Sequence, residues 1–131
     1  MSNNDFNQTT FFRPDVVSTS NSAQITIFDG SSEPIDIDLA HFRKAVISFG
    51  RDEKNDIVIR SKFVSRQHGY FKLINGTWII ENNPQSTNGL IYNGAKIDSK
   101  TLDDRDNIRI DNSIETSATG VLIVFSTGGK C

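Results

Sequence analysis

The sequence is poor in the parts on which most enzymes and secreted proteins depend. Its 131 residues include one cysteine, Cys131, which excludes an internal disulfide, and only two histidines. No Ser-His-acid arrangement, metal-spaced cluster or Walker-type phosphate loop is apparent. We therefore expect no enzymatic activity, no cofactor and no metal.

Long apolar runs and a strong net charge are also absent. No apolar run approaches the roughly 20 residues that span a bilayer, and the N-terminal MSNNDFNQTTFF lacks the basic start and apolar stretch of a signal peptide. The formal net charge of −2, without interleaved basic and aromatic residues, does not favour nucleic acid or anionic lipid. We expect a cytoplasmic protein with no membrane insertion and no nucleic-acid partner.

What the sequence does contain is a series of short apolar runs separated by polar, glycine-punctuated turns. Asn75-Gly76 and Asn93-Gly94 are strong signals for two-residue hairpins. Many short strands without a helical period predict an all-β protein, an antiparallel β-sandwich. The strands are expected at residues 23–28, 35–39, 45–49, 57–59, 69–74, 77–81, 90–92, 95–97, 107–110 and 120–125. The core is expected to include Phe71, Trp78, Ile80, Leu122 and Val124.

The predicted domain does not use the whole chain. Residues 1–22 are rich in Asn, Ser and Thr and show no periodicity, which is typical of a flexible tail. Residues 23–126 hold the predicted strands, and residues 127–131 are expected to fray.

Three loops carry the residues that are best suited to binding. They contain Gly50-Arg51, Ser65-Arg66-Gln67-His68 and Ser86-Thr87-Asn88-Gly89. Because the loops of a sandwich cluster at its two ends, we expect loops 50–56, 61–67 and 82–89 to share one end. An arginine fork with hydroxyl donors matches a phosphate dianion, whereas an amide can both donate to and accept from a peptide backbone.

The order and spacing of these motifs resemble the forkhead-associated (FHA) domains. The resemblance covers roughly residues 23–126, and several short motifs in the right order make it specific. The residues that carry it are Gly50-Arg51, Asn55–Ile59, Val64-Ser65-Arg66-Gln67-His68, Ser86-Thr87-Asn88-Gly89, Asn93-Gly94 and the block 102–110. Arg105 departs from the family, which usually has glycine before the position of Asp106.

The resemblance implies a module that recognises phosphothreonine-containing proteins in bacterial Ser/Thr kinase signalling. It assigns the phosphate to Arg51, Ser65 and Arg66. Thr87 would form the wall around the phosphothreonine, and Asn88 would bind the peptide backbone. The family's support residues correspond to Gly50, His68 and Gly89, with His68 bracing the loop rather than touching the ligand.

Three matters stay open at this point. Lys62 would favour an acidic residue and Phe63 an apolar one at the third position after the phosphothreonine. Thr9 and Thr10 belong either to a solvated tail or to a phosphorylatable segment that resembles the threonine pair of small bacterial FHA proteins, although Gln8 replaces their glutamate. The alternative function is an FHA-fold scaffold that binds partners without phosphate.

Overall fold

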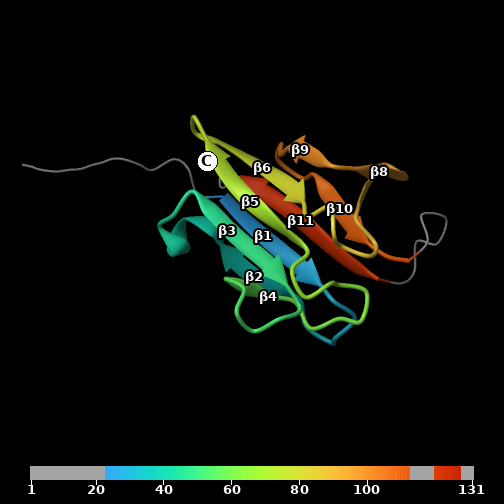
Figure 1. The fold of residues 1–131 in the computed structure, drawn as a ribbon. Helices are drawn as coiled ribbons and strands as arrows, with labels where there is room; N and C mark the ends of the chain where they lie inside the picture. The colour runs from blue at the N-terminus through green and yellow to red at the C-terminus, as the bar shows by residue number, and fades with distance from the viewer. Residues whose placement is uncertain (1–22, 113–119, 128–131) are drawn as a thin grey trace, which may run out of the picture.

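A computed structural model describes residues 23–112 and 120–127 of the chain as a sandwich of two β-sheets (Figure 1). One sheet has the strand order β2-β1-β11-β10-β7-β8 and the other β4-β3-β5-β6-β9. The pairs are antiparallel except β3 with β4, which is parallel. The predicted all-β sandwich is confirmed. The elements are β1 (Ala23–Phe28), β2 (Ile35–Asp38), the 3-10 helix η2 (Leu39–Phe42), β3 (Val46–Gly50), β4 (Ile57–Val58), β5 (Gly69–Ile74), β6 (Thr77–Asn82), β7 (Leu90–Tyr92), β8 (Ala95–Ile97), β9 (Ser99–Thr101), β10 (Asn107–Ile110) and β11 (Val121–Thr127).

Both predicted hairpins form, and their turns have the same backbone geometry. Asn75 and Gly76 join β5 to β6 with φ angles of 52° and 80°. Asn93 and Gly94 join β7 to β8 with the same two angles. Positive φ at both central residues is what a twisted two-residue hairpin needs, so the Asn-Gly pairs explain both turns.

The core lies between the two sheets and is filled by alternate residues of the strands. Phe71, Trp78 and Ile80 are buried there, as predicted. The prediction for Leu122 and Val124 is wrong, because both lie half-buried on the other face of β11. The inward residues of that strand are Val121, Ile123 and Phe125. Every residue of β11 from 121 to 125 is apolar, so alternation along the sequence could not identify the inward face.

Two elements differ from the predicted strands. The strand expected at 35–39 ends at Asp38, whose carboxylate oxygen Oδ1 accepts a hydrogen bond from the Ala40 backbone nitrogen at 3.0 Å. That cap starts η2, whose first residue, Leu39, is fully buried. Strand β9 was not predicted because its three residues are polar and it lies at the edge of its sheet.

The strand directions divide the sandwich into two ends. We call one end the loop pole; it carries residues 51–56, 59–68 and 83–89. We call the other end the hairpin pole; it carries η2, the β5–β6 turn and the start of β1. In Figure 1 the tip of the β5–β6 hairpin and the long green loops lie at opposite ends of the strands.

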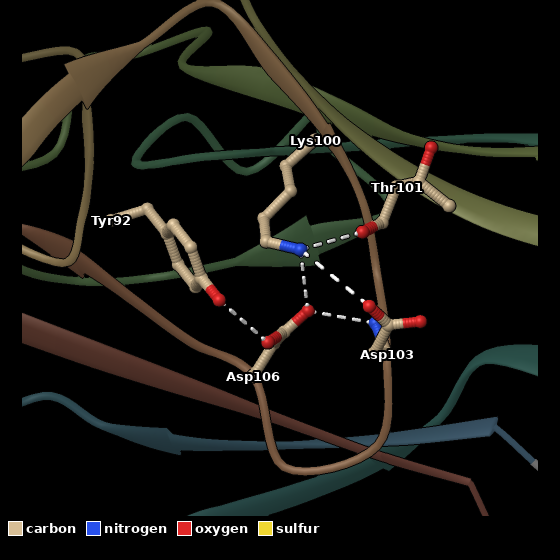
Figure 2. A network of polar contacts seen from close by, with 5 residues as sticks. All are labelled: Tyr92, Lys100, Thr101, Asp103 and Asp106. Atoms are coloured by element: carbon tan, nitrogen blue, oxygen red, sulfur yellow. Dashed lines mark hydrogen bonds and ion pairs between the residues drawn. The ribbon is translucent and has the colours of Figure 1, made fainter.

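A polar network holds the connection between β9 and β10 in place (Figure 2). Asp106 accepts hydrogen bonds from the Tyr92 hydroxyl at 3.1 Å and the Asp103 backbone nitrogen at 2.7 Å, and it pairs with the Lys100 ammonium at 2.9 Å. Partial burial raises the pKa of Asp106, but these three partners outweigh it and the pKa falls below its usual value. Arg105, at a position where the resemblance implies glycine, has a φ of 72° in this turn.

Candidate functional site

Two loops of the loop pole are joined backbone to backbone. The Arg51 nitrogen donates to the Ser65 oxygen at 2.9 Å, and the Asp52 nitrogen donates to the Arg66 oxygen at 3.2 Å. A Cβ on Gly50 would lie 2.2 Å from the Arg66 carbonyl oxygen, which no real Cβ tolerates. Only glycine therefore lets the two loops approach closely enough to place Arg51 beside Ser65.

The Arg51 side chain is held at its base and exposed at its tip. Its Nε donates to the Val64 carbonyl oxygen at 3.0 Å. That bond uses one of the five guanidinium donors and fixes the stem. The terminal nitrogens are left at the surface of the loop pole, where two of them can bind two oxygens of one anion.

The third loop joins the first two through Ser65 and Asn88. The Thr87 backbone nitrogen donates to the Ser65 hydroxyl oxygen at 2.9 Å, so the hydroxyl hydrogen of Ser65 remains available to a ligand. The Asn88 side-chain nitrogen donates to the Phe63 carbonyl oxygen at 2.8 Å, which leaves its amide oxygen as an acceptor. The structure thus brings residues 51, 65, 87 and 88 to one end of the molecule.

His68 braces these loops from below. It is fully buried, and its Nδ1 accepts a hydrogen bond from the Ser65 nitrogen at 3.0 Å. Its Nε2 lies 2.8 Å from the Gly89 carbonyl oxygen, so the neutral ring carries its proton on Nε2 and donates it there. Burial lowers the pKa of His68, an effect that the Gly89 carbonyl opposes and the charge of Lys96 reinforces. The ring links Ser65 to Gly89 without reaching the surface.

The remaining predicted residues lie at the edges of this site. Arg66 is exposed and shares the lining of a hollow of about 420 Å³ with Arg51 and Arg60. Phe63 is half-buried against the core, and the Lys62 ammonium lies 5.5 Å from the centre of its ring. Thr9 and Thr10, in contrast, lie outside the described residues.

Three residues of the loop pole, and Lys96 of β8 beside it, were given no role from the sequence. Asn55 donates to the Arg66 oxygen at 2.7 Å and to the Asp52 oxygen at 2.9 Å, and Asn83 donates to the Gln67 oxygen at 3.1 Å. Lys96 hydrogen-bonds the Asn88 backbone oxygen, and Arg60 pairs with the exposed Glu53. Polar residues in loops have no period to read, so only the position of Asn55 inside a family motif could have signalled its role.

Other kinds of site have no support in the described parts of the chain. Within residues 23–112 and 120–127, no group of three or more His, Cys, Asp or Glu is placed to hold a metal ion. None of the helices in those same ranges is long and apolar enough to cross a membrane.

Comparison with known proteins bears on the family. The family model of the FHA domain matches residues 47–111. The Slr1951 protein from Synechocystis is 22% identical, with a TM-score of 0.66 over 79% of this chain and 96% of its own. The FHA domain of the CT664 protein from Chlamydia trachomatis is 21% identical, with a TM-score of 0.64 over 82% of this chain and 99% of its own.

A third similar structure is EmbR from Mycobacterium tuberculosis, in complex with a low-affinity phosphopeptide. It is 24% identical, with a TM-score of 0.59 over 82% of this chain and 25% of EmbR. Comparison with curated proteins finds no match. At sequence identities of 21–24%, these structures support the fold alone. The match to the FHA family model adds the sequence motifs within residues 47–111. Residues 47–111, with the sandwich built around them, belong to the FHA domain family.

Proposed function

We propose that the loop pole binds phosphothreonine peptides. One observation carries the proposal: the Arg51 guanidinium and the Ser65 hydroxyl come from loops that are hydrogen-bonded to each other, and both retain free donors. Each charge-assisted hydrogen bond to a phosphate contributes about 1.5–3 kcal/mol. Arg66 and the peptide-facing amide of Asn88 complete the proposed contacts, and Thr87 is the proposed wall for the threonine methyl group.

The proposed partner is a phosphothreonine-containing protein, either a Ser/Thr kinase or one of its substrates. EmbR, which shares this fold, has been observed with a phosphopeptide, and this supports the ligand class. The cytoplasmic location and the division of the chain into tail, domain and frayed end stay predictions.

The experiment is an oriented phosphothreonine-peptide library screened against the wild type and Arg51→Ala. We expect the wild type to select phosphorylated peptides and Arg51→Ala to select none. Arg51→Lys keeps the charge and loses the planar fork, so it is expected to recover only part of the binding. Equal capture of phosphorylated and plain peptides by the wild type would instead favour the phosphate-independent scaffold.

We further propose that phosphorylation of Thr9 or Thr10 places the tail in the chain's own site. Thr10 lies thirteen positions before Ala23, so the tail extends to about 43–47 Å, more than twice the roughly 20 Å of a six-residue strand. That length reaches the loop pole from the opposite end. A tethered ligand has an effective concentration in the millimolar range, so modest affinity suffices.

The test is an NMR titration with a threonine kinase. The amide signals of Arg51 and Ser65 are expected to move when the tail is phosphorylated, and a Thr9→Ala/Thr10→Ala variant should leave them unchanged. Signals that stay still in the phosphorylated wild type would exclude self-recognition while leaving binding of other peptides intact.

A further inference from the structure

A second hollow, of about 350 Å³, opens at the hairpin pole, away from the candidate phosphate site. Unlike the hollow beside Arg51, its floor and most of its wall are apolar. It is lined by Leu39, Ala40, Arg43, Lys44, Ala45, Leu73 and Trp78. The two basic residues come from the segment that follows η2.

This hollow is an opening into the core. Leu73 lies two residues beyond the buried Phe71 on β5 and is paired with Trp78 across the hairpin, so it faces inward by strand alternation. Leu73 is nevertheless 36% exposed, and the next residue, Ile74, is 50% exposed. Ile74 and Val46, which is 48% exposed, point to the outer face of the sheet by the same alternation and do not line the hollow. The apolar hollow is therefore open to solvent beside Leu73, and an exposed apolar surface marks a binding site more often than an accident of packing.

The chain itself arrives beside this opening. In the pairing of β1 with β2, Gln24 lies opposite Asp38, which caps η2 and precedes the buried Leu39. Ala23, the first described residue, therefore lies next to the wall of the hollow. Everything before Ala23 in the sequence is tethered at this point.

The tethered sequence contains a segment of matching chemistry. Residues 11–17 read Phe-Phe-Arg-Pro-Asp-Val-Val, and four of these seven side chains are large and apolar. Residues 18–22, Ser-Thr-Ser-Asn-Ser, separate the segment from Ala23 and allow a span of about 20 Å. The segment carries Arg13 and Asp15 and has no net charge, and Asp15 is the residue whose charge is opposite to that of Arg43 at the rim.

We propose that the hollow at the hairpin pole is the docking site for the chain's own residues 11–17, with the aromatic pair against Leu73 and Trp78. Because the segment is tethered within a few residues of the hollow, its effective concentration is in the millimolar range and a weak contact is sufficient. The docking needs no phosphate and does not involve Arg51 or Ser65, so its failure would leave the proposed binding of other phosphothreonine peptides intact. It competes with self-recognition by phosphorylated Thr9 or Thr10, because residues next to Phe11 cannot lie at both poles at once.

The chain provides its own probe, because Trp78 is its single tryptophan. The experiment compares the full chain with a Phe11→Ser/Phe12→Ser variant. We expect the Trp78 emission to shift to longer wavelength, and the amide signals of Ala40, Ala45 and Leu73 to move, while those at Thr87 and Asn88 do not. Phe6→Ser, which changes an aromatic residue outside the segment, is the matched control and should change none of these signals.

Three results would overturn the proposal. One is unchanged Trp78 emission and unchanged hollow signals in the double variant, and another is an equal change in Phe6→Ser. The third is a dependence of the wild-type signals on protein concentration across a dilution series, which would assign the hollow to a second copy of the chain. The substituted residues lie outside the described residues. A Leu73→Gln variant is a check from the other side, since in it the double substitution should have little further effect.

Discussion

The two poles of the sandwich are closed by different means. At the loop pole, hydrogen bonds between loop backbones and the side chains of Asn55, Ser65, His68 and Asn88 hold three loops together. At the hairpin pole, where the Leu102 nitrogen donates to the Trp78 oxygen at 2.9 Å, an apolar hollow is only partly covered, and the charged network around Asp106 holds the turn that follows Leu102. A pole held by many directional bonds can keep donors such as those of Arg51 and Ser65 at fixed positions. A partly open apolar pole is suited instead to a non-directional contact.

The largest expected difference between the poles concerns their glycines. Gly50→Ala forces a methyl group against the Arg66 carbonyl, and we expect it to lower the free energy of unfolding by about 3 kcal/mol. Gly76→Ala at the other pole meets nothing within 4 Å and pays only for its φ of 80°, about 1 kcal/mol. Urea denaturation measures both. Equal losses would show that the close approach of the two loops is not required.

The next effect concerns binding at the loop pole. Ser65→Ala removes the proposed hydroxyl donor to the phosphate, and we expect the affinity for a phosphothreonine peptide to fall about 10- to 100-fold, the equivalent of roughly 1.5–3 kcal/mol. The control is Ser86→Ala in the third loop, whose hydroxyl bonds Asn82 at 2.7 Å and faces no ligand in this account. Isothermal titration calorimetry distinguishes the two. An equal loss in both variants would mean that Ser65 acts only through the shape of the loops.

A smaller effect is expected from the protonation of His68. Burial lowers the pKa of its ring in the folded protein, so the unfolded chain binds the proton more readily. The stability that comes from the neutral ring is therefore complete above the ordinary histidine pKa, near 6.5, and decreases as the pH falls below it. Protonation of Nδ1 also breaks its bond from the Ser65 nitrogen.

Unfolding experiments in urea at pH 7 and pH 5.5 measure this dependence, and the amide signal of Ser65 reports the local change. A His68→Gln variant should lose the dependence between these two pH values. If the wild type and the variant show the same dependence, another group is responsible.

The smallest expected effects come from single ion pairs, one at each pole. Lys100→Gln removes a pair whose side chains are mostly buried, and we expect it to cost about 1 kcal/mol. Arg60→Gln breaks an exposed pair with Glu53 and should change stability by less than about 0.5 kcal/mol. Thermal unfolding of the two variants decides the order, and a larger loss in Arg60→Gln would contradict it.

Because the folded pKa of Asp106 is lowered, its contribution to stability is present above the ordinary carboxyl pKa, about 4, and is lost below it.

The fold was largely predictable from the sequence because its turns depend on the conformational preferences of the residues within them. Asn75-Gly76 and Asn93-Gly94 fix two hairpins through their own φ preferences, and most strands between them alternate. The prediction failed where the structure depends on pairing with strands that are distant in the sequence. The inward face of β11 depends on its register with β1 and β10, and the edge strand β9 is recognised only through its pairing with β6.

The sequence predicted which residues form the candidate site, but not how those residues are hydrogen-bonded within the protein. Arg51, Ser65 and Asn88 stand in family motifs, but the sequence does not say which groups are already used within the protein. In the structure the Asn88 nitrogen is engaged by Phe63, and the Ser65 oxygen accepts from Thr87. These bonds join residues 22 and 25 positions apart, a separation at which no periodicity in the sequence is informative.

The most direct test of the account is a binding cycle with two changes, Arg51→Ala in the protein and removal of the phosphate from the peptide. If the guanidinium and the phosphate interact, each change alone weakens binding strongly and the second adds little to the first. We predict that Arg51→Ala binds the phosphorylated and the plain peptide with nearly equal affinity. A variant that keeps the full preference of the wild type for the phosphorylated peptide would contradict the account.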